Sequence, residues 1–329
     1  MAKPRITIIG LGVTGSSLGL GLQREAGDFE IVGHDKNSQA IQAARKANAV
    51  HRTDWNLHNA CEGADLILLA VPLSELRDLL HHIREDLRSD TLVFAVVNVL
   101  QPAIAVAAAE LGAETHFVVG HPVLTGIGGP LTIRADLFDE VPFSLAPGLH
   151  TDPSAVQLAS DFVERIGAKP FFVDAQEHDG LIAATEQLPQ LLAAALMHLS
   201  ISGPGWREAR RLAGRHFAKA TELDASAAQL FSALQANRDN LLVRIDQLQQ
   251  ELNGWRELLA LEPAEDEKHP LLSQLEAIVE ERLRWEGQVI LKRWDDPVTP
   301  SQNEETRGMF RQMFFGNMMG RRPDRDKRS

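Results

Sequence analysis

Short apolar runs alternate with stretches of helical periodicity over the first half of the chain. The runs that we expect to form strands cover residues 6–9, 30–34, 66–71, 92–97, 117–119, 143–145 and 170–173. Apolar strands that alternate with amphipathic helices are typical of a parallel sheet covered by helices on both faces. The pattern therefore predicts a doubly wound, mostly parallel α/β domain over residues 1–175, with the segment 153–166 as one of its later helices.

The second half of the chain has a different pattern. After Glu177 the sequence is rich in Ala, Leu, Gln, Glu and Arg and has no strand-like runs, which predicts an all-α helical domain over residues 176–296. Nine positions recur there at spacings of three and four: Leu230, Leu234, Asn237, Leu241, Ile245, Leu248, Leu252, Trp255 and Leu259. With Asp224 as its N-cap, this repeat predicts a single helix of roughly 35 residues, about 50 Å long.

A helix longer than a domain is wide usually packs against a partner. We therefore expect a homodimer formed through the helical dimerisation domain, with a core helix of a monomer as the alternative. Residues 297–329 are polar and end in a basic segment, which predicts a partly disordered tail.

Length, charge and cysteine content narrow the classes of protein. A chain of 329 residues is long enough for two domains. Its 45 acidic and 33 basic residues give a net charge of -12, which disfavours nucleic acid as a partner. A single cysteine, Cys61, permits no intrachain disulfide, and no Cys and His spacing suggests a metal site. The single cysteine fits a reducing cytosol, so we expect a cytoplasmic protein. No apolar run approaches the ~20 residues of a membrane span, so none is expected.

A glycine motif follows the first predicted strand. Gly10, Gly12 and Gly15 form GxGxxG directly before a helical pattern. In this context the first glycine permits a tight turn, the second admits a pyrophosphate to the backbone, and the third lets helix and strand pack closely. The motif predicts a Rossmann-type dinucleotide site whose turn includes Val13 and Thr14.

Two further segments fit the same site. Asp35 ends the second predicted strand, where a carboxylate accepts hydrogen bonds from ribose hydroxyls and repels a 2'-phosphate. The sequence therefore favours NAD over NADP, although the adjacent Lys36 could neutralise a phosphate. Val71 and Pro72 close the fourth strand of the Rossmann pattern and are expected to lie beside the cofactor. For Pro72 the alternative is that it only ends the strand.

One histidine stands out as a candidate catalytic group. His121 follows a predicted strand within GlyHisPro at 120–122, at the carboxyl edge of the sheet where cofactor and substrate meet. Histidine is the usual acceptor of a hydroxyl proton because its pKa lies near neutrality. A buried histidine bonded to backbone is the alternative interpretation of His121.

With these motifs in place, the chain resembles the prephenate and arogenate dehydrogenase family. The resemblance covers roughly residues 4–290. It rests on the glycine motif, Asp35, AlaValPro at 70–72, GlyHisPro at 120–122, LeuPheAsp at 137–139, HisAsp at 178–179 and GlyTrpArgGluAlaArgArgLeuAla at 205–213. The resemblance implies an NAD-dependent oxidoreductase of tyrosine biosynthesis. Such an enzyme oxidatively decarboxylates prephenate to 4-hydroxyphenylpyruvate, or arogenate to tyrosine.

The resemblance also assigns roles to residues. It implies that His121 accepts the proton of the ring hydroxyl and that Arg211 binds a carboxylate of the dicarboxylate substrate. Arginine suits this task because its guanidinium forms paired hydrogen bonds with a carboxylate. Arg207 lies four residues before Arg211, so on one helix the two side chains would share a face.

Several positions depart from the family pattern. Val99 and Gln101 stand where the family usually has a serine that orients the histidine and a lysine, and Gln187 and Gln190 stand where it usually has two histidines. Glutamine can still hydrogen-bond a substrate oxygen, so Gln187 remains a candidate for substrate binding, but it carries no charge. A pocket with three fewer potential cations would bind a dianion less tightly.

The departures leave alternatives open. The chain is either a working dehydrogenase of this family, a relative with a changed small-acid substrate, or an NAD-binding protein without turnover. Hydroxyacid dehydrogenases share the glycine-rich domain and a helical tail. They place a catalytic lysine on the helix that here lacks one between His178 and Ser200, which disfavours them.

Overall fold

The computed structural model describes residues 3–112, 114–125, 131–223, 225–263 and 268–293. The chain forms two compact units, Met1–Glu257 and Leu258–Ser329. The predicted tail at 297–329 and the proposed N-cap Asp224 lie outside the described residues.

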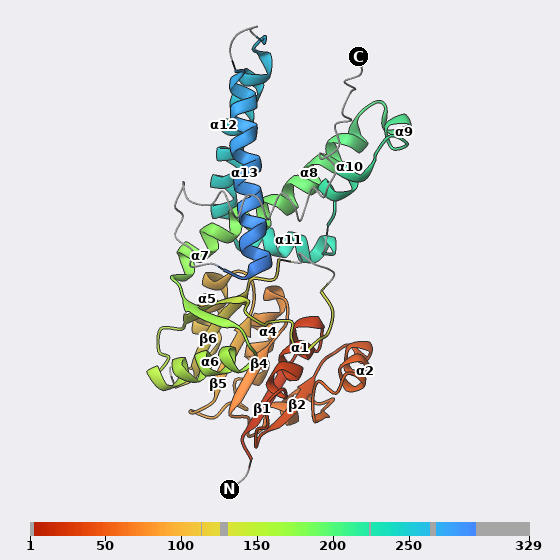
Figure 1. Ribbon diagram of the computed structural model, residues 1–329. Helices are drawn as coiled ribbons and strands as arrows, with labels where there is room; N and C mark the ends of the chain where they lie inside the picture. The colour runs from red at the N-terminus through yellow and green to blue at the C-terminus, as the bar shows by residue number, and fades with distance from the viewer. Residues whose placement is uncertain (1–2, 113, 126–130, 224, 264–267, 294–329) are drawn as a thin grey trace, which may run out of the picture. The chain divides into compact units, whose positions relative to one another are not determined.

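One sheet of eight strands forms the centre of the first unit (Figure 1). Its order is β3-β2-β1-β4-β5-β6-β7-β8, and neighbouring strands are parallel except for the antiparallel pair β6 and β7. The strands are β1(Arg5–Ile9), β2(Glu30–His34), β3(Arg52–Thr53), β4(Leu66–Leu69), β5(Leu92–Val96), β6(His116–Pro122), β7(Pro142–Pro147) and β8(Lys169–Phe172). Every predicted strand is present, and the doubly wound, mostly parallel class is confirmed. The two-residue β3 was not predicted, because its polar side chains give no apolar run.

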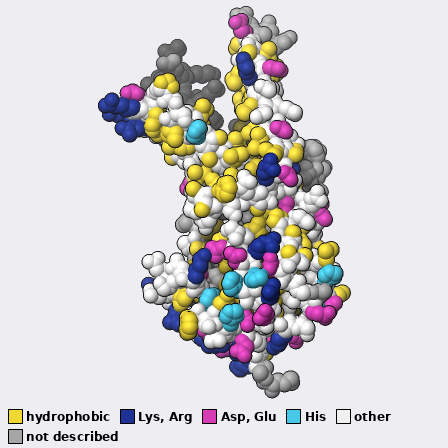
Figure 2. All heavy atoms as spheres, turned by 180° about the vertical axis from the view of Figure 1, so that it is seen from behind, with side chains coloured by type: hydrophobic (Ala, Val, Ile, Leu, Met, Phe, Trp, Pro, Cys, Tyr) yellow, Lys and Arg dark blue, Asp and Glu magenta, His cyan; other side chains and the backbone are white. Residues whose placement is uncertain are grey.

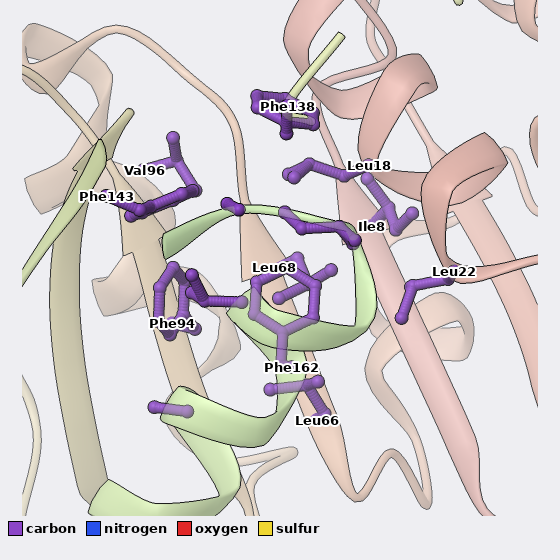
Figure 3. Close-up of a cluster of buried hydrophobic side chains, with 14 of the residues drawn as sticks. Ile8, Leu18, Leu22, Leu66, Leu68, Phe94, Val96, Phe138, Phe143 and Phe162 are labelled. Carbon is purple, nitrogen blue, oxygen red and sulfur yellow. The ribbon is translucent and has the colours of Figure 1, made fainter. Parts of the chain in front are cut away.

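Helices cover both faces of this sheet. The helices of the α/β part are α1(Val13–Leu22), α2(Ser38–Lys46), α3(Leu57–Cys61), α4(Leu73–Ile83), α5(Leu100–Glu110) and α6(Pro153–Arg165). Side chains of the strands alternate in direction, so one face packs against α1 and α6 and the other against α4 and α5. Figure 3 shows the first of these cores, in which Leu18 and Leu22 of α1 and Phe162 of α6 surround the strand residues Leu68 and Phe94.

Helices follow the sheet in the remainder of the first unit. They are α7(Ala175–Ile182), a π-helical turn η1(Ala183–Gln187), α8(Leu188–Ser202), α9(Trp206–Ala209), α10(Arg215–Ala220), α11(Ala227–Ala236) and α12(Arg238–Ala260), whose last residues belong to the second unit. Among the described residues after β8 there is no strand, as the sequence predicted.

The prediction of one long helix capped by Asp224 was wrong. The segment forms α11 and α12, of 10 and 23 residues, and Ser226 caps α11 through a capping box with Gln229. Asn237 interrupts the helix: its backbone is non-helical (φ -125, ψ 27), and its buried side-chain amide donates hydrogen bonds to the Asp179 carbonyl and to Gln187 Oε1. These tertiary bonds stabilise the break, and the repeat of apolar side chains gives no sign of them.

The second unit contains α13(Pro270–Leu291). His269 caps this helix by accepting a hydrogen bond from the Leu271 backbone N–H, and an Arg282–Glu286 ion pair spans one of its turns. No described helix combines the length and the apolar character needed to cross a membrane.

Candidate functional site

A cavity of about 410 Å³ opens at the carboxyl edge of the sheet. It is lined by Thr14 of α1, by residues 70–73 after β4, by residues 96–98 after β5, by His121 and Pro122 of β6, and by Leu124 and Glu186. The strand order reverses between β1 and β4, and ligands of doubly wound sheets bind at this kind of switch point. The cavity therefore lies where the glycine motif and His121 meet.

The glycine turn between β1 and α1 fits a dinucleotide. Gly10 has a φ of +92, and a Cβ built there would lie 2.3 Å from the Ala70 carbonyl oxygen. A Cβ on Gly15 would lie 1.8 Å from the Gly10 carbonyl oxygen, so helix and turn can pack this closely only with glycine. A Cβ on Gly12 would meet no described heavy atom within 4 Å, which leaves open space at the N-terminus of α1, where a phosphate is stabilised.

The other predicted cofactor residues surround this turn. Asp35 accepts hydrogen bonds from the backbone N–H groups of Leu11 (2.6 Å) and Asn37 (2.7 Å), so its carboxylate lies beside the glycine turn. Thr14, Val71 and Pro72 line the cavity, and Val13 is partly exposed at the start of α1. The structure thus brings all of the predicted cofactor residues to one region. Their contacts with NAD stay a prediction.

Lys36, the residue that could have favoured a 2'-phosphate, has a partner. Its Nζ lies 2.7 Å from Glu75 Oε1, in the first turn of α4. Because both side chains are exposed, the pair is weak, but it directs the ammonium toward a carboxylate.

His121 lies in the last part of β6, which runs three residues beyond the predicted strand 117–119 and ends at Pro122. Its side chain is 7% exposed. Nε2 lies 3.2 Å from Glu186 Oε1, and Nδ1 lies 3.2 Å from His178 Nε2. Both ring nitrogens therefore face side chains, which disfavours the interpretation of His121 as a core histidine bonded to backbone.

Behind His121 lies a buried pair that sequence reasoning noted only as part of the resemblance. His178 Nδ1 is 3.1 Å from Asp179 Oδ1, and both side chains are nearly inaccessible to solvent. The Asp179 carboxylate also accepts hydrogen bonds from the backbone N–H groups of Leu100 (2.7 Å) and Gln101 (2.9 Å), at the N-terminus of α5. Asp179 thus caps α5, where Val99 offers no side-chain cap, and supports the histidine that contacts His121.

Glu186 was not predicted as a site residue. It belongs to η1, and single π-helical turns often occur at functional sites. Its Oε2 accepts a hydrogen bond from Asn98 Nδ2 at 3.1 Å. Burial raises the pKa of the Glu186 carboxyl, but the hydrogen bond and charge of His121 and the Asn98 amide outweigh it, and the pKa falls below its usual range. Glu186 is therefore an anion at neutral pH.

Gln187 lies next to Glu186 but does not line the cavity. It is buried, its Nε2 donates to the Ala233 carbonyl at 2.9 Å, and its Oε1 accepts from Asn237 at 2.8 Å. Both ends of the amide thus hold α11 against η1. These contacts favour a structural role for Gln187 over the predicted substrate contact.

The two candidate arginines are also away from the cavity lining. Arg207 and Arg211 are exposed, and neither lines the cavity. The expectation that they share a helix face was wrong. The helix α9 ends at Ala209, and Arg211 belongs to a tight turn in which its N–H donates to the Glu208 carbonyl. Glycines at 205 and 214 flank this segment and keep the helix short, and Figure 2 shows basic side chains gathered on it.

The contacts of Asp179 predict a measurable effect on stability. Asp179→Asn should lower the free energy of unfolding by about 1–3 kcal/mol, because an amide nitrogen cannot accept the bonds of the α5 N-terminus. It should also lower kcat, because His178 loses its carboxylate partner. Chemical denaturation and steady-state kinetics check both effects.

The matched control for Asp179→Asn is Asp174→Asn. Asp174 caps α7 through the N–H groups of Gln176 and Glu177, and asparagine caps a helix equally well. This control should leave stability and kcat at wild-type values. An Asp179→Asn variant that behaves like the control would contradict the role given to Asp179.

The chain matches known families over most of its length. Residues 18–171 match the family model described as prephenate dehydrogenase, nucleotide-binding domain, and residues 174–275 match the one described as prephenate dehydrogenase, dimerization domain. The first match begins after the glycine motif, so the motif supports a nucleotide site independently.

Individual relatives agree with the family models. The chain is 31% identical to a probable prephenate dehydrogenase, NovF, of Streptomyces niveus over 77% of this chain and 68% of that protein. It is 28% identical to a cyclohexadienyl dehydrogenase of Zymomonas mobilis over 78% of this chain and 88% of that protein. The crystal structure of prephenate dehydrogenase from A. aeolicus, in complex with hydroxyphenyl propionate and NAD+, has the same fold: the TM-score is 0.76 at 21% identity, over 86% of this chain and 99% of that one.

Proposed function

The chain belongs to the prephenate dehydrogenase family, and from this premise we propose that it catalyses the NAD-dependent oxidative decarboxylation of prephenate to 4-hydroxyphenylpyruvate. The observation that carries the proposal is the position of His121 in a cavity at the switch point of the sheet, beside the glycine turn. Carbon dioxide leaves as the ring becomes aromatic.

The residues around the glycine turn would hold the cofactor. NAD, when bound, accepts a hydride from the ring carbon that bears the hydroxyl group. Gly12 leaves room for its pyrophosphate, Gly10 and Gly15 permit the close packing of the turn, and Asp35 would accept hydrogen bonds from the ribose hydroxyls. The pairing of Lys36 with Glu75 supports NAD rather than NADP.

His121 acts as the base in this proposal, and its neighbours set its tautomer. The Asp179 carboxylate only accepts hydrogen bonds, so the hydrogen of neutral His178 lies on Nδ1, and Nε2 carries the lone pair. His178 Nε2 can then accept from His121 Nδ1–H, and the lone pair of His121 is left on Nε2, in the cavity. Nε2 is thus ready to take the hydroxyl proton of the substrate. His178 and Asp179 replace the orienting group that Val99 cannot supply.

A second candidate substrate is arogenate. The described residues that line the cavity include no Lys or Arg, and Glu186 contributes a negative charge. An amino group in place of the keto group gives arogenate a positive charge that prephenate lacks, and this lowers the electrostatic cost of binding near a carboxylate.

The assay that tests the proposed function is NADH formation by the purified protein with NAD and either prephenate or arogenate. Formation of NADH with prephenate supports the proposal, and formation with arogenate alone selects the second candidate. If NAD binds and neither compound yields NADH, the proposed function is wrong. The chain is then a relative with a changed substrate or a binding protein.

Arg211 is proposed to bind a substrate carboxylate, which requires the α9 segment of this chain or of a second copy to reach the cavity. Arg211→Ala should raise KM for prephenate about 10- to 100-fold with a smaller change in kcat, because a charge-assisted hydrogen bond contributes about 1.5–3 kcal/mol. Arg207→Ala is expected to have a weaker effect, and Arg210→Ala is the control on the same segment. Equal KM values for Arg211→Ala and wild type would show that Arg211 does not bind the substrate.

The proposed assembly is a homodimer through the helical domain. The family model over residues 174–275 is that of a dimerization domain. The helix α8 exposes Leu192, Leu196 and Leu199 at helical spacing, and Figure 2 shows hydrophobic side chains gathered over this part of the molecule. An apolar stripe of this kind is typical of a helix that packs on a partner.

A further inference from the structure

Four side chains form a continuous chain of contacts from the buried interior to the cavity mouth. Asp179, His178, His121 and Glu186 follow one another at distances of 3.1, 3.2 and 3.2 Å between their nitrogen and oxygen atoms. The exposed fractions of the side chains are 2%, 7%, 7% and 38% in the same order. Glu186 is therefore the member with substantial access to solvent.

The three contacts of this chain need three N–H hydrogens. Two neutral imidazoles carry only two, and the carboxylates at both ends carry none. With Asp179 fixing the tautomers, the contact without a hydrogen is the one between His121 Nε2 and Glu186 Oε1. One more proton on Nε2 completes all three hydrogen bonds, and it places one positive charge between two negative ones. This series of contacts therefore lacks one hydrogen when His121 is neutral, which is the state in which His121 can accept a proton from the substrate.

We propose that Glu186 is a positioning and proton-transfer residue that takes from His121 the proton of the substrate hydroxyl and gives it back when carbon dioxide leaves. This inference rests on the proposed function. The substrate O–H bond breaks as an N–H bond forms on His121 Nε2, and that N–H bond breaks as an O–H bond forms on Glu186 Oε1. The C–H electron pair of the same ring carbon would pass to NAD as hydride, and the O–H pair becomes the second bond of a carbonyl group. When the bond to the carboxylate breaks, its electron pair completes the aromatic ring, and the proton returns from Glu186 through His121 to the ring oxygen, so no net proton is released.

The surroundings of Glu186 suit this task. Asn98 Nδ2 holds Oε2, which directs Oε1 to His121. His178 contacts His121 at Nδ1, away from Glu186, and Asp179 contacts His178. With the proton on His121, the hydrogen bond and charge of His121 and the Asn98 amide lower the pKa of Glu186, so the carboxylate does not retain the proton that it receives.

Two substitutions of Glu186 test the proposal in the full chain. Glu186→Gln keeps the size and the hydrogen bond with Asn98 but cannot take a proton, and Glu186→Ala leaves a space at the cavity mouth. Both should lower kcat by about tenfold. This is less than the ~100-fold of a primary base, because His121 Nε2 can also lose its proton to water in the cavity. Formate should restore kcat of Glu186→Ala with saturation and should leave Glu186→Gln unchanged.

The control is Glu177→Gln, on the exposed side of α7, which should keep the wild-type kcat. Unchanged NAD affinity and unfolding temperature would show that both Glu186 variants are folded. A Glu186→Gln variant with wild-type kcat, or a Glu186→Ala variant that formate does not restore, would overturn the proposal.

A second measurement is independent of turnover. Nitrogen-15 NMR of histidine-labelled free protein at neutral pH reports whether His121 Nε2 carries a hydrogen. We expect the Nε2 signal to differ between wild type and Glu186→Gln, and identical signals would also overturn the proposal. If the wild type forms no NADH from either substrate, the proposed function fails, while the NMR comparison still decides whether Glu186 and His121 share a proton.

Discussion

Replacing His121 by Asn should lower kcat for prephenate by about 100-fold or more while the affinity for NAD stays at the wild-type value. A positioned general base contributes about 100- to 10,000-fold, and the asparagine amide cannot accept a proton at neutral pH. Asparagine retains a polar group in the buried position, so the network to His178 is weakened but no large cavity forms. Steady-state kinetics and equilibrium binding of NAD measure the two quantities.

The control for His121→Asn is His116→Asn in the same strand. His116 begins β6, five residues away and outside the cavity lining, and its Nε2 lies 3.7 Å from Asp152. This variant should keep the wild-type kcat. A His121→Asn variant with more than about a tenth of wild-type kcat would exclude His121 as the base.

Alanine at two glycines of the turn should separate cofactor binding from stability. Gly12→Ala should raise the Kd of NAD by about 10- to 100-fold at unchanged stability, because the new methyl group enters the open space at the N-terminus of α1. The backbone of Gly12 is extended (φ -67, ψ -164), so alanine adds no strain there. Calorimetric titration with NAD and thermal unfolding measure the two effects.

Gly15→Ala is the matched contrast. Its methyl carbon would lie 1.8 Å from the Gly10 carbonyl oxygen, and neither backbone can move without separating α1 from β1. We expect a loss of about 1–3 kcal/mol in the free energy of unfolding, together with weaker NAD binding. Equal stability of the Gly12 and Gly15 variants would contradict the packing described for this turn.

The α/β part of the fold could be predicted from the sequence because its strands are apolar runs. Segments such as 66–69 and 92–96 are buried on both faces of a parallel sheet, so their sequence is free of polar residues. The helix boundaries of the second half could not be predicted in the same way. The break at Asn237 depends on hydrogen bonds to Asp179 and Gln187, which lie 58 and 50 residues away in the chain. Periodicity within one segment contains no information on such contacts.

The candidate site was predictable where function depends on local backbone. The roles of Gly10 and Gly15 could be predicted from the turn that they form, and the role of His121 from its place at the end of a strand. Glu186 and Asp179 were missed as functional residues, because their roles come from neighbours in other elements. The available signals were the HisAsp pair at 178–179 and the charged Glu186 in an otherwise uncharged stretch, 180–197. Neither signal indicated a contact with His121.

Two of the side chains that replace the usual family residues lie away from the cavity in the structure. Val99 and Gln187 are buried and have no access to the cavity, so they cannot perform the roles of the serine and histidine that the resemblance implies. His178 and Glu186 instead contact the two ring nitrogens of His121. The departures therefore do not leave His121 without partners.

Product analysis of the wild-type protein with NAD and prephenate tests the central claim most directly. Chromatography and mass spectrometry should find 4-hydroxyphenylpyruvate and NADH in equal amounts, and His121→Asn under the same conditions should yield neither above about a hundredth of that amount. Consumption of NAD without 4-hydroxyphenylpyruvate, or no product at all from protein that binds NAD, would contradict the assignment of this cavity as a prephenate dehydrogenase site.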